Sequence, residues 1–339
     1  MKRFLAGVLS ALLLGAAAVG FAGCGDDDRS RAPKHYDVYA PDGATALALV
    51  NAIAQEKEGY TYHVVDSSTI QSYVTGNAPA ADFCVLPLNA ASKLLGTGET
   101  YQMLGTVTNG NLYFLTTGSN AAITDENLST LVGKTVGVVQ LANVPGLALQ
   151  VALKNHNVEY TIIGNDGATQ SDRVNLKAVD GADVTPASPY DYFLFPEPAA
   201  STKVTATASA PKPFVAAGSL QALYEGGGFP QAVLVAKKSV IQNDPASVTE
   251  FITFMDGSAE YLKTVQPATV LELLNDKRTE GLTPSFNAKN LTAQVLANCS
   301  VKFTASKDCK ETVNAFLAQL IAVNANAAKT VETAFFYEG

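Results

Sequence analysis

The sequence Tyr36-Asp-Val-Tyr-Ala-Pro41-Asp-Gly-Ala-Thr45 opens the folded part of this 339-residue chain. Its first five residues alternate in the pattern of a strand. Pro41, Asp42 and Gly43 are turn formers, and residues 45–56 are rich in alanine and leucine, which favour helix. A strand, a tight turn and a helix in succession predict an α/β fold.

The same alternation of strand-like and helix-like segments continues along the chain. Residues 101–108 and 112–117 predict two strands separated by the tight-turn sequence Asn109-Gly110-Asn111. The pattern restarts near residue 118, which indicates a second α/β unit, and the chain beyond residue 236 is expected to be helical. The other expected strands are residues 60–65, 81–87, 135–139, 159–163, 193–195 and 231–236.

The N-terminus has the layout of an export signal. Met1-Lys2-Arg3 is followed by an apolar run that ends in Phe21-Ala22-Gly23-Cys24. Small residues directly before a cysteine resemble the lipobox of bacterial lipoproteins, although Phe21 departs from the usual leucine. The resemblance implies a signal peptide over residues 1–24 and lipid on Cys24, with residues 25–34 as a flexible tether. A transmembrane anchor is the alternative.

Composition limits the partners of the folded part. About 300 residues lie beyond His35, more than one hydrophobic core usually organises, which suggests two domains. The formal net charge is −8, and it falls to −10 once Lys2 and Arg3 are removed. No basic patch is left to attract phosphates, so nucleic acid is excluded as a partner.

Cysteine usage suggests one disulfide. Cys84 lies in an apolar run, whereas Cys299 and Cys309 are close in sequence near the C-terminus. In an oxidising compartment we expect these two to pair. Two reduced thiols are the alternative, since sequence does not reveal the geometry that a disulfide requires.

The loops that follow strands carry the candidate ligand-binding residues. In open α/β sheets, ligands bind beyond the carboxyl ends of the strands, where helix N-termini offer free N–H groups. Small and amide-bearing side chains in such loops suit hydrogen bonding to a ligand, although the same residue types also cap helices and fill turns. These candidates are Asp42, Thr45, Asn89, Asn111, Gln140 and Asn143.

Two further motifs carry a family resemblance: Val144-Pro145-Gly146 at a helix start and Phe195-Pro196-Glu197-Pro198-Ala199 late in the second unit. With the lipobox and the strand–turn–helix opening, they resemble the solute-binding proteins of nitrate-, sulfonate- and taurine-type ABC importers, which are related to thiamine-precursor binding proteins. The resemblance implies the type II periplasmic-binding-protein fold, in which two α/β lobes with mainly parallel sheets enclose the ligand. The crossover strands would be residues 112–117 and 231–236, with residues 35–116 and 233–339 in the first lobe and 117–232 in the second.

The resemblance also implies which residues line the cleft: Asp42, Asn89, the loop from Gln140 to Gly146, and Glu197. Glu197 has two other interpretations, a salt bridge to a lysine or a cap on the next helix. The chain has no tryptophan, so stacking on a flat ligand would fall to tyrosines such as Tyr113 and Tyr190, unless these simply pack.

Catalytic motifs are absent from the sequence. The three histidines, His35, His63 and His156, have no metal-binding spacing, and neither a nucleophile elbow nor a phosphate loop occurs. We therefore expect no cofactor and no metal.

The expected function is transport. A monomeric, lipid-anchored protein on the extracytoplasmic face of the cell membrane would deliver a small solute to an ABC transporter permease. Few basic residues fall in the predicted loops, which favours a neutral or zwitterionic solute, including an aromatic one. The alternatives are an enzyme on the same fold that catalyses a small-molecule elimination, and a tethered ligand sensor.

Overall fold

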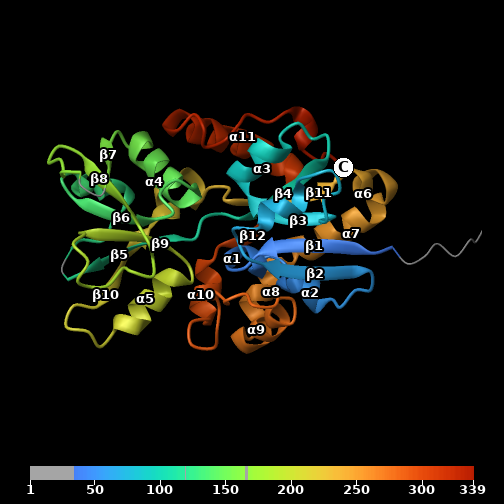
Figure 1. The fold of residues 1–339 in the computed structure, drawn as a ribbon, viewed down its shortest axis with the longest axis horizontal. Coiled ribbons are helices and arrows are strands. Elements are labelled where there is room, and N and C mark those ends of the chain that lie inside the picture. Colours follow the sequence, from blue (N-terminus) through green and yellow to red (C-terminus); the bar gives the residue numbers. More distant parts are fainter. Residues whose placement is uncertain (1–33, 119, 165–166) are drawn as a thin grey trace, which may run out of the picture. The chain divides into compact units, whose positions relative to one another are not determined.

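Two six-stranded β-sheets organise residues 35–339 in the computed structural model (Figure 1). The structure describes residues 34–118, 120–164 and 167–339. The predicted signal peptide and Cys24 lie outside the described residues. Among the helices of the described residues, none combines the length and the apolar character that a membrane span needs.

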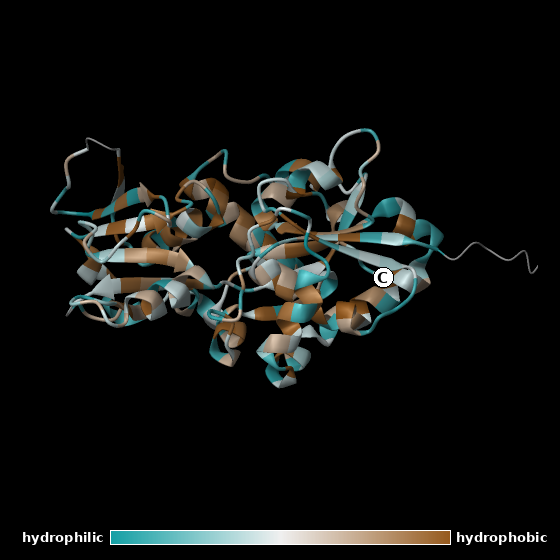
Figure 2. Cartoon of the chain, turned by 60° about the horizontal axis from the view of Figure 1, so that its bottom comes forward, coloured by the Kyte–Doolittle hydropathy of each residue, from teal (hydrophilic) through white to brown (hydrophobic). Residues whose placement is uncertain are grey.

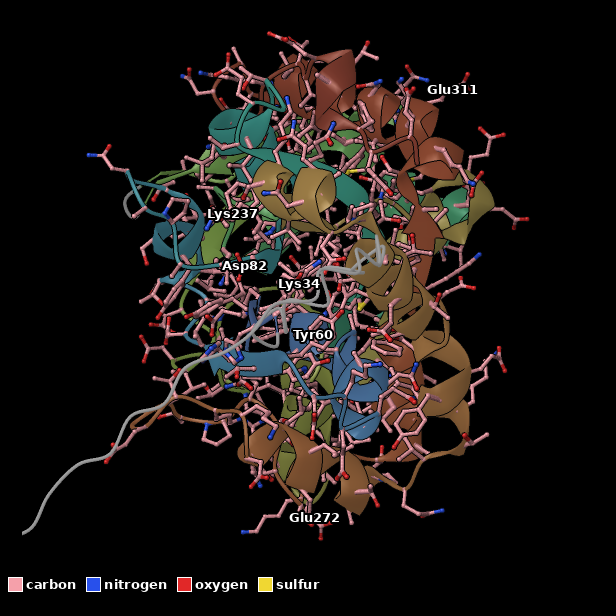
Figure 3. All side chains as sticks on the ribbon, turned by 90° about the vertical axis from the view of Figure 1, so that its right-hand side faces the viewer. Lys34, Tyr60, Asp82, Lys237, Glu272 and Glu311 are labelled. Atoms are coloured by element: carbon pink, nitrogen blue, oxygen red, sulfur yellow. The ribbon has the colours of Figure 1, made fainter. Side chains whose placement is uncertain are left out.

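The first sheet has the strand order β12-β4-β11-β3-β1-β2. β1, β2 and β3 are parallel, and β11 runs antiparallel to both β3 and β4. Asp82 and Lys237, where β3 begins and β11 ends, form an ion pair at 3.6 Å (Figure 3). The strands of this sheet are β1 (Tyr36–Pro41), β2 (Tyr60–Val65), β3 (Phe83–Pro87), β4 (Tyr101–Thr108), β11 (Ala232–Lys237) and β12 (Val301–Ala305).

The second sheet has the order β10-β5-β9-β6-β8-β7. β6 pairs in parallel with β8 and β9, and β7 pairs in parallel with β8, whereas β5 is antiparallel to both β9 and β10. Both sheets are therefore mixed, as predicted, but only the second is parallel at its centre; in the first sheet the parallel strands are β3, β1 and β2 at one side, and β11 at the centre is antiparallel to both neighbours. The strands of this sheet are β5 (Leu112–Thr117), β6 (Thr135–Val139), β7 (Tyr160–Ile163), β8 (Val174–Val179), β9 (Tyr192–Pro196) and β10 (Phe214–Ser219).

Helices flank both sheets. We call the first sheet with its helices the first lobe, and the second sheet with α4 and α5 the second lobe. The helices are α1 (Ala44–Leu47), α2 (Val50–Ala54), α3 (Leu88–Leu95), α4 (Val144–Asn155), α5 (Ala199–Thr207), α6 (Lys238–Asn243), α7 (Pro245–Asp256), α8 (Ser258–Thr264), α9 (Pro267–Asn275), α10 (Ala293–Asn298) and α11 (Ser306–Val323). The 3₁₀ turns are η1 (Ile70–Val74), η2 (Asp125–Leu131), η3 (Leu220–Leu223), η4 (Glu225–Gly227) and η5 (Thr333–Phe335).

The chain crosses between the lobes at points that differ from the prediction. Asn109-Gly110-Asn111 does not close a hairpin, because β4 and β5 belong to different sheets. This tripeptide is the first crossing, so the predicted crossover strand at 112–117 lies wholly in the second sheet. The return crossing precedes β11, and its Gln231 donates to the carbonyl of Thr108 at 3.0 Å. The two crossing segments therefore run side by side.

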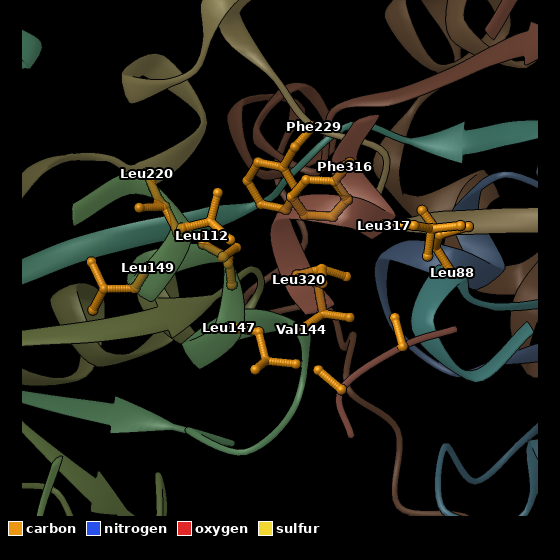
Figure 4. Packing of buried hydrophobic residues seen from close by; sticks show 14 of the residues in the cluster. Leu88, Leu112, Val144, Leu147, Leu149, Leu220, Phe229, Phe316, Leu317 and Leu320 are labelled. Carbon is orange, nitrogen blue, oxygen red and sulfur yellow. The ribbon is translucent and has the colours of Figure 1, made fainter. Parts of the chain in front are cut away.

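Hydrophobic side chains fill both faces of the first sheet. Along β3, Phe83 and Val85 belong to one buried cluster, whereas Cys84 and Leu86 belong to another. Figure 2 shows hydrophobic residues both on the strands and on the helices that flank the sheets. The second of these clusters continues into the other lobe through α11, whose Leu317 and Leu320 share it with α4 (Figure 4).

The predicted disulfide between Cys299 and Cys309 is not formed, and both residues are buried free thiols. Cys299 belongs to the core cluster on one face of the first sheet and Cys309 to the cluster on the other. β12 separates them along the chain, so the sheet keeps the two sulfur atoms apart. Burial raises the pKa of both thiols.

Candidate functional site

A pocket of about 380 Å³ lies at the carboxyl ends of strands from both sheets. The first lobe contributes loops after β1, β2 and β3, and the second lobe contributes loops after β6 and β9. Such strand ends are where open α/β sheets bind ligands. The lining residues are Thr45, Ser67, Ser68, Gln71, Pro87, Asn89, Ala90, Lys93, Gln140, Asn143, Val144, Pro145, Pro196, Gln231 and Ala232.

The first-lobe wall is built around the start of α3. Pro87 ends β3 and serves as the N-cap of this helix, without a capping side chain. Leu88 N–H donates to the carbonyl of Gln231 at 3.0 Å, which fixes the helix start against the return crossing. Asn89 is buried and donates to the carbonyl of Ala327 at 3.4 Å. Its amide oxygen is the part left for a ligand.

The second-lobe wall is the loop between β6 and α4. Gln140 has the left-handed φ of 56°, and Asn143 is the N-cap of α4. The side chain of Asn143 makes no capping hydrogen bond. Because Pro145 lacks an N–H and stands in the first turn, where helical N–H groups have no partner anyway, the helix begins there without strain. The amides of Gln140 and Asn143 are thereby presented to the pocket.

The charge that lines this pocket is of one sign, positive. Lys93 on α3 is the charged side chain among the described lining residues, which include no Asp, Glu, His or Cys. The starts of α3 and α4 add N–H groups and the positive ends of two helix dipoles. The walls therefore offer mainly hydrogen-bond donors, with amide and hydroxyl oxygens as acceptors.

Of the residues predicted from sequence, Thr45, Asn89, Gln140 and Asn143 line the pocket. Asn111 lies next to it, since its Oδ1 accepts from the pocket residue Gln231 at 2.9 Å. Sequence reasoning missed Ser67, Ser68, Gln71, Lys93 and Gln231. The two serines lie in the loop that follows the predicted strand 60–65, so the search for polar residues in loops after strands could have found them.

The remaining predicted residues do not line this pocket. Asp42 forms a buried ion pair with Arg278 at 3.0 Å and accepts from Ser285 N–H at 2.6 Å. Tyr190 packs edge-on against Phe193 with ring centroids 5.7 Å apart. The carboxylate of Asp42 and the ring of Tyr190 thus contact other groups of the protein instead of this pocket.

Glu197 and Tyr113 also point elsewhere. Glu197 is 4% exposed and accepts from the backbone N–H of Ser201 in the first turn of α5 at 3.1 Å. The cap on the next helix, one of the interpretations considered for Glu197, is therefore what the structure has. Tyr113 donates its hydroxyl to the carbonyl of Asn298 at 2.9 Å.

A larger cavity of about 760 Å³ borders the return crossing, away from the strand ends described above. His156, the C-cap of α4, lies in its wall and contacts Asp125 through Nε2. Nδ1 lies 2.7 Å from the carbonyl oxygen of Ala152. Because a backbone carbonyl and a carboxylate both accept hydrogen bonds, this geometry favours the doubly protonated imidazolium.

The titration of His156 predicts a pH dependence of stability. Burial lowers its pKa, but hydrogen bonds to Asp125 and to the Ala152 carbonyl outweigh burial and raise it above the ordinary value of 6.5. A raised folded-state pKa gives stabilisation that is complete below the unfolded pKa and is lost as pH rises through the folded pKa. We expect the wild type to melt at a higher temperature than His156→Gln, with the largest difference between pH 5 and about 6.5. The difference between the two melting temperatures should decrease as the pH rises further. A gap that widens at alkaline pH would contradict this assignment.

Comparisons with known proteins bear on the fold. A scan against protein-family models finds no match, and a search of curated proteins finds no similar sequence. Among solved structures, an ABC transporter protein from Parabacteroides distasonis is 16% identical with a TM-score of 0.68, over 90% of this chain and 99% of that one. The chain has the fold of ABC-importer binding proteins.

Two further structures with this fold have more specific descriptions. The periplasmic aliphatic sulphonate binding protein SsuA from Escherichia coli is 13% identical with a TM-score of 0.58, over 88% of this chain and 96% of that one. A zinc-bound ligand-binding component of an ABC-type import system from Staphylococcus aureus is 9% identical with a TM-score of 0.52, over 90% and 98%. The two-lobed α/β architecture predicted from sequence is thus confirmed.

Proposed function

We propose that this protein binds a small polar solute in the pocket between its lobes and delivers it to an ABC transporter permease. One observation carries the proposal: both lobes contribute strand ends and loop amides to the same pocket. A solute held there touches both lobes at once, so binding can be linked to a change in their arrangement. A permease could then distinguish the loaded protein from the empty one.

The setting of this function is the extracytoplasmic face of the membrane. The N-terminal sequence supports processing before Cys24 and lipid attachment there, with the folded part acting as a monomer. A solute-binding protein tethered in this way stays near its permease. The absence of Asp, Glu, His and Cys from the described pocket lining leaves no pair for general acid–base chemistry, which favours binding over an elimination reaction.

The lining favours a solute with an anionic group. Lys93 and the two helix starts are all positive or donor groups, and none of the described lining residues is a carboxylate that could receive an ammonium group. This modifies the expectation of a neutral or zwitterionic solute, which rested on loops that did not include Lys93. The amides of Asn89, Gln140 and Asn143 would hydrogen-bond the rest of the molecule.

Neutralising Lys93 is expected to weaken binding of an anionic solute. Because Lys93 is exposed, its attraction is screened, and Lys93→Gln should raise the dissociation constant by about fivefold at low salt and by less at high salt. Isothermal titration at two salt concentrations measures this. Lys289→Gln, an exposed lysine outside the pocket lining, is the matched control. Equal affinities for the two variants would contradict an anionic solute at Lys93.

A thermal-shift screen tests the proposed function itself. The protein beginning after Cys24 would be screened with aliphatic sulfonates, nitrate, thiamine precursors, nucleobases and amino acids. A solute that binds only the folded state raises the melting temperature in proportion to the logarithm of its concentration above the dissociation constant. We expect a shift with an anionic member of the panel that is lost in Asn143→Ala. A folded, ligand-free protein that no compound stabilises would count against solute binding.

A further inference from the structure

We propose that Asn298, the last residue of α10, is a latch that holds the two lobes in the arrangement seen here. It contacts Glu197 and Tyr113, both of the second lobe, while itself belonging to the first lobe. We call these three residues the α10 latch. The proposal rests on the proposed function only in its consequence for solute affinity.

The α10 latch joins the lobes through both the side chain and the backbone of Asn298. The side-chain amide of Asn298 donates to Glu197 Oε1 at 2.8 Å. The backbone carbonyl of the same residue accepts from the Tyr113 hydroxyl at 2.9 Å. Glu197 follows β9 and Tyr113 lies on β5, so two neighbouring strands of the second sheet are tied to one helix end.

Because Glu197 is buried, its carboxylate depends on hydrogen-bond donors from the protein, and Asn298 is one of them. This carboxylate is 4% exposed and accepts from three donors, of which two, the N–H and the hydroxyl of Ser201, belong to its own lobe. The third is Asn298. Because the carboxylate is buried in this arrangement, a change that removes the Asn298 donor leaves part of its charge without a hydrogen-bond partner and makes the arrangement less favourable.

The direction of each hydrogen bond is fixed by its neighbours. Gln294 donates to Asn298 Oδ1 at 2.8 Å, which leaves the Asn298 amino group to face Glu197. Burial raises the pKa of Tyr113, and the charge of Glu197 raises it further, so the hydroxyl remains a donor. In each hydrogen bond of the α10 latch, the neighbouring groups therefore fix which partner donates and which accepts.

The α10 latch bears on solute binding through the populations of lobe arrangements. The pocket needs walls from both lobes. If the arrangement with both walls in place is only partly populated, the apparent affinity falls by the same fraction. A device that holds the lobes together thus sets how readily the pocket is formed, without touching the solute.

A distance measurement between the lobes tests the latch and requires no solute. The full chain, purified in detergent in a Cys24→Ser background, would carry spin labels at Glu272→Cys on α9 and Lys212→Cys in the second lobe. Both positions are exposed, and Glu272 is marked in Figure 3. The native cysteines 84, 299 and 309 are buried and free, so labelling at the two new sites is favoured.

Asn298→Asp places a second carboxylate beside Glu197. We expect a population with a changed inter-lobe distance to increase by about tenfold or more, as loss of a hydrogen bond to a charged group implies. Adding Glu197→Gln restores a donor facing the new carboxylate and should return the wild-type distance distribution. Asn298→Ala, which adds no charge, should give a smaller change in the same direction.

Asn243→Ala is the matched control, since Asn243 is an exposed asparagine at the end of α6 in the first lobe. Wild-type distances in folded Asn298→Asp and Asn298→Ala would overturn the latch. So would a change that Glu197→Gln does not reverse. Because no solute enters the measurement, failure of the proposed function would leave this test intact.

Discussion

Gly146→Ala is expected to destabilise the protein and to abolish solute binding in the pocket between the lobes. A Cβ atom at position 146 would lie 2.1 Å from the carbonyl oxygen of Leu141 and 2.4 Å from its Cα. Both are backbone atoms of the loop after β6, so either this loop or α4 must move. Overpacking of this kind costs about 1–3 kcal/mol. Urea unfolding measures the loss, and the thermal-shift screen measures the binding.

Gly146→Ala is expected to affect solute binding because its Cβ atom would clash with the loop that lines the pocket. Gln140 and Asn143 line the pocket from this same loop, and the first turn of α4 begins beside them. Gly164→Ala is the control, because a Cβ atom there would meet nothing within 4 Å. A folded Gly146→Ala protein with wild-type stability and solute affinity would show that the loop does not shape the pocket.

Asp42→Asn is expected to have the largest effect on stability. The Asp42–Arg278 pair is buried, with side chains 4% and 6% exposed. Arg278 already has one buried guanidinium nitrogen, Nη2, without a hydrogen-bond partner. Removing the carboxylate charge leaves a buried cation uncompensated, which typically costs about 3–5 kcal/mol. Denaturant unfolding at constant pH measures this difference.

A double substitution tests whether the loss of stability comes from the uncompensated charge of Arg278. With Arg278→Met added to Asp42→Asn, the buried charge disappears, so the double variant should be more stable than the single one. Asp276→Asn is the control, because its contact with Lys277 is at 4.0 Å and its side chain is 83% exposed. Equal stability of Asp42→Asn and Asp276→Asn would contradict the importance of the buried pair.

Local sequence rules predicted those parts of the site that depend on local structure. Thr45, Asn89 and Asn143 lie in the pocket because each stands where a strand gives way to a helix, and hydrophobic periodicity locates that point. Gln140 was found in the same way. Lys93 was missed because it lies in the second turn of α3, where only the helix geometry brings it back toward the strand ends.

Long-range partners explain why two predicted residues do not line the pocket. Asp42 looked available for a ligand, but Arg278 reaches it from 236 residues away. For Glu197, the sequence suggested a ligand, a lysine or the next helix as partner, but not Asn298, which contacts it from 101 residues away. Nothing in the local sequence reveals such a partner, because the contact depends on how the later helices pack.

The first crossing between the lobes was predicted on the strand that follows it, at residues 112–117, for a related reason. Asn109-Gly110-Asn111 has turn residues, and Gly110 does adopt a left-handed φ of 90°. A hairpin also needs the two flanking strands to pair, but β4 pairs with β11 and β12 whereas β5 pairs with β9 and β10. β12 was overlooked as well, since Val301–Ala305 is short and lies between helical segments.

The most direct test of solute binding between the lobes is a crystal structure of the protein with the first solute that raises its melting temperature. We predict electron density for the solute at the strand ends, in contact with Asn89, Gln140 and Asn143 and with its anionic group toward Lys93. Solute density in the larger cavity beside His156, with the strand-end pocket holding none, would contradict the account.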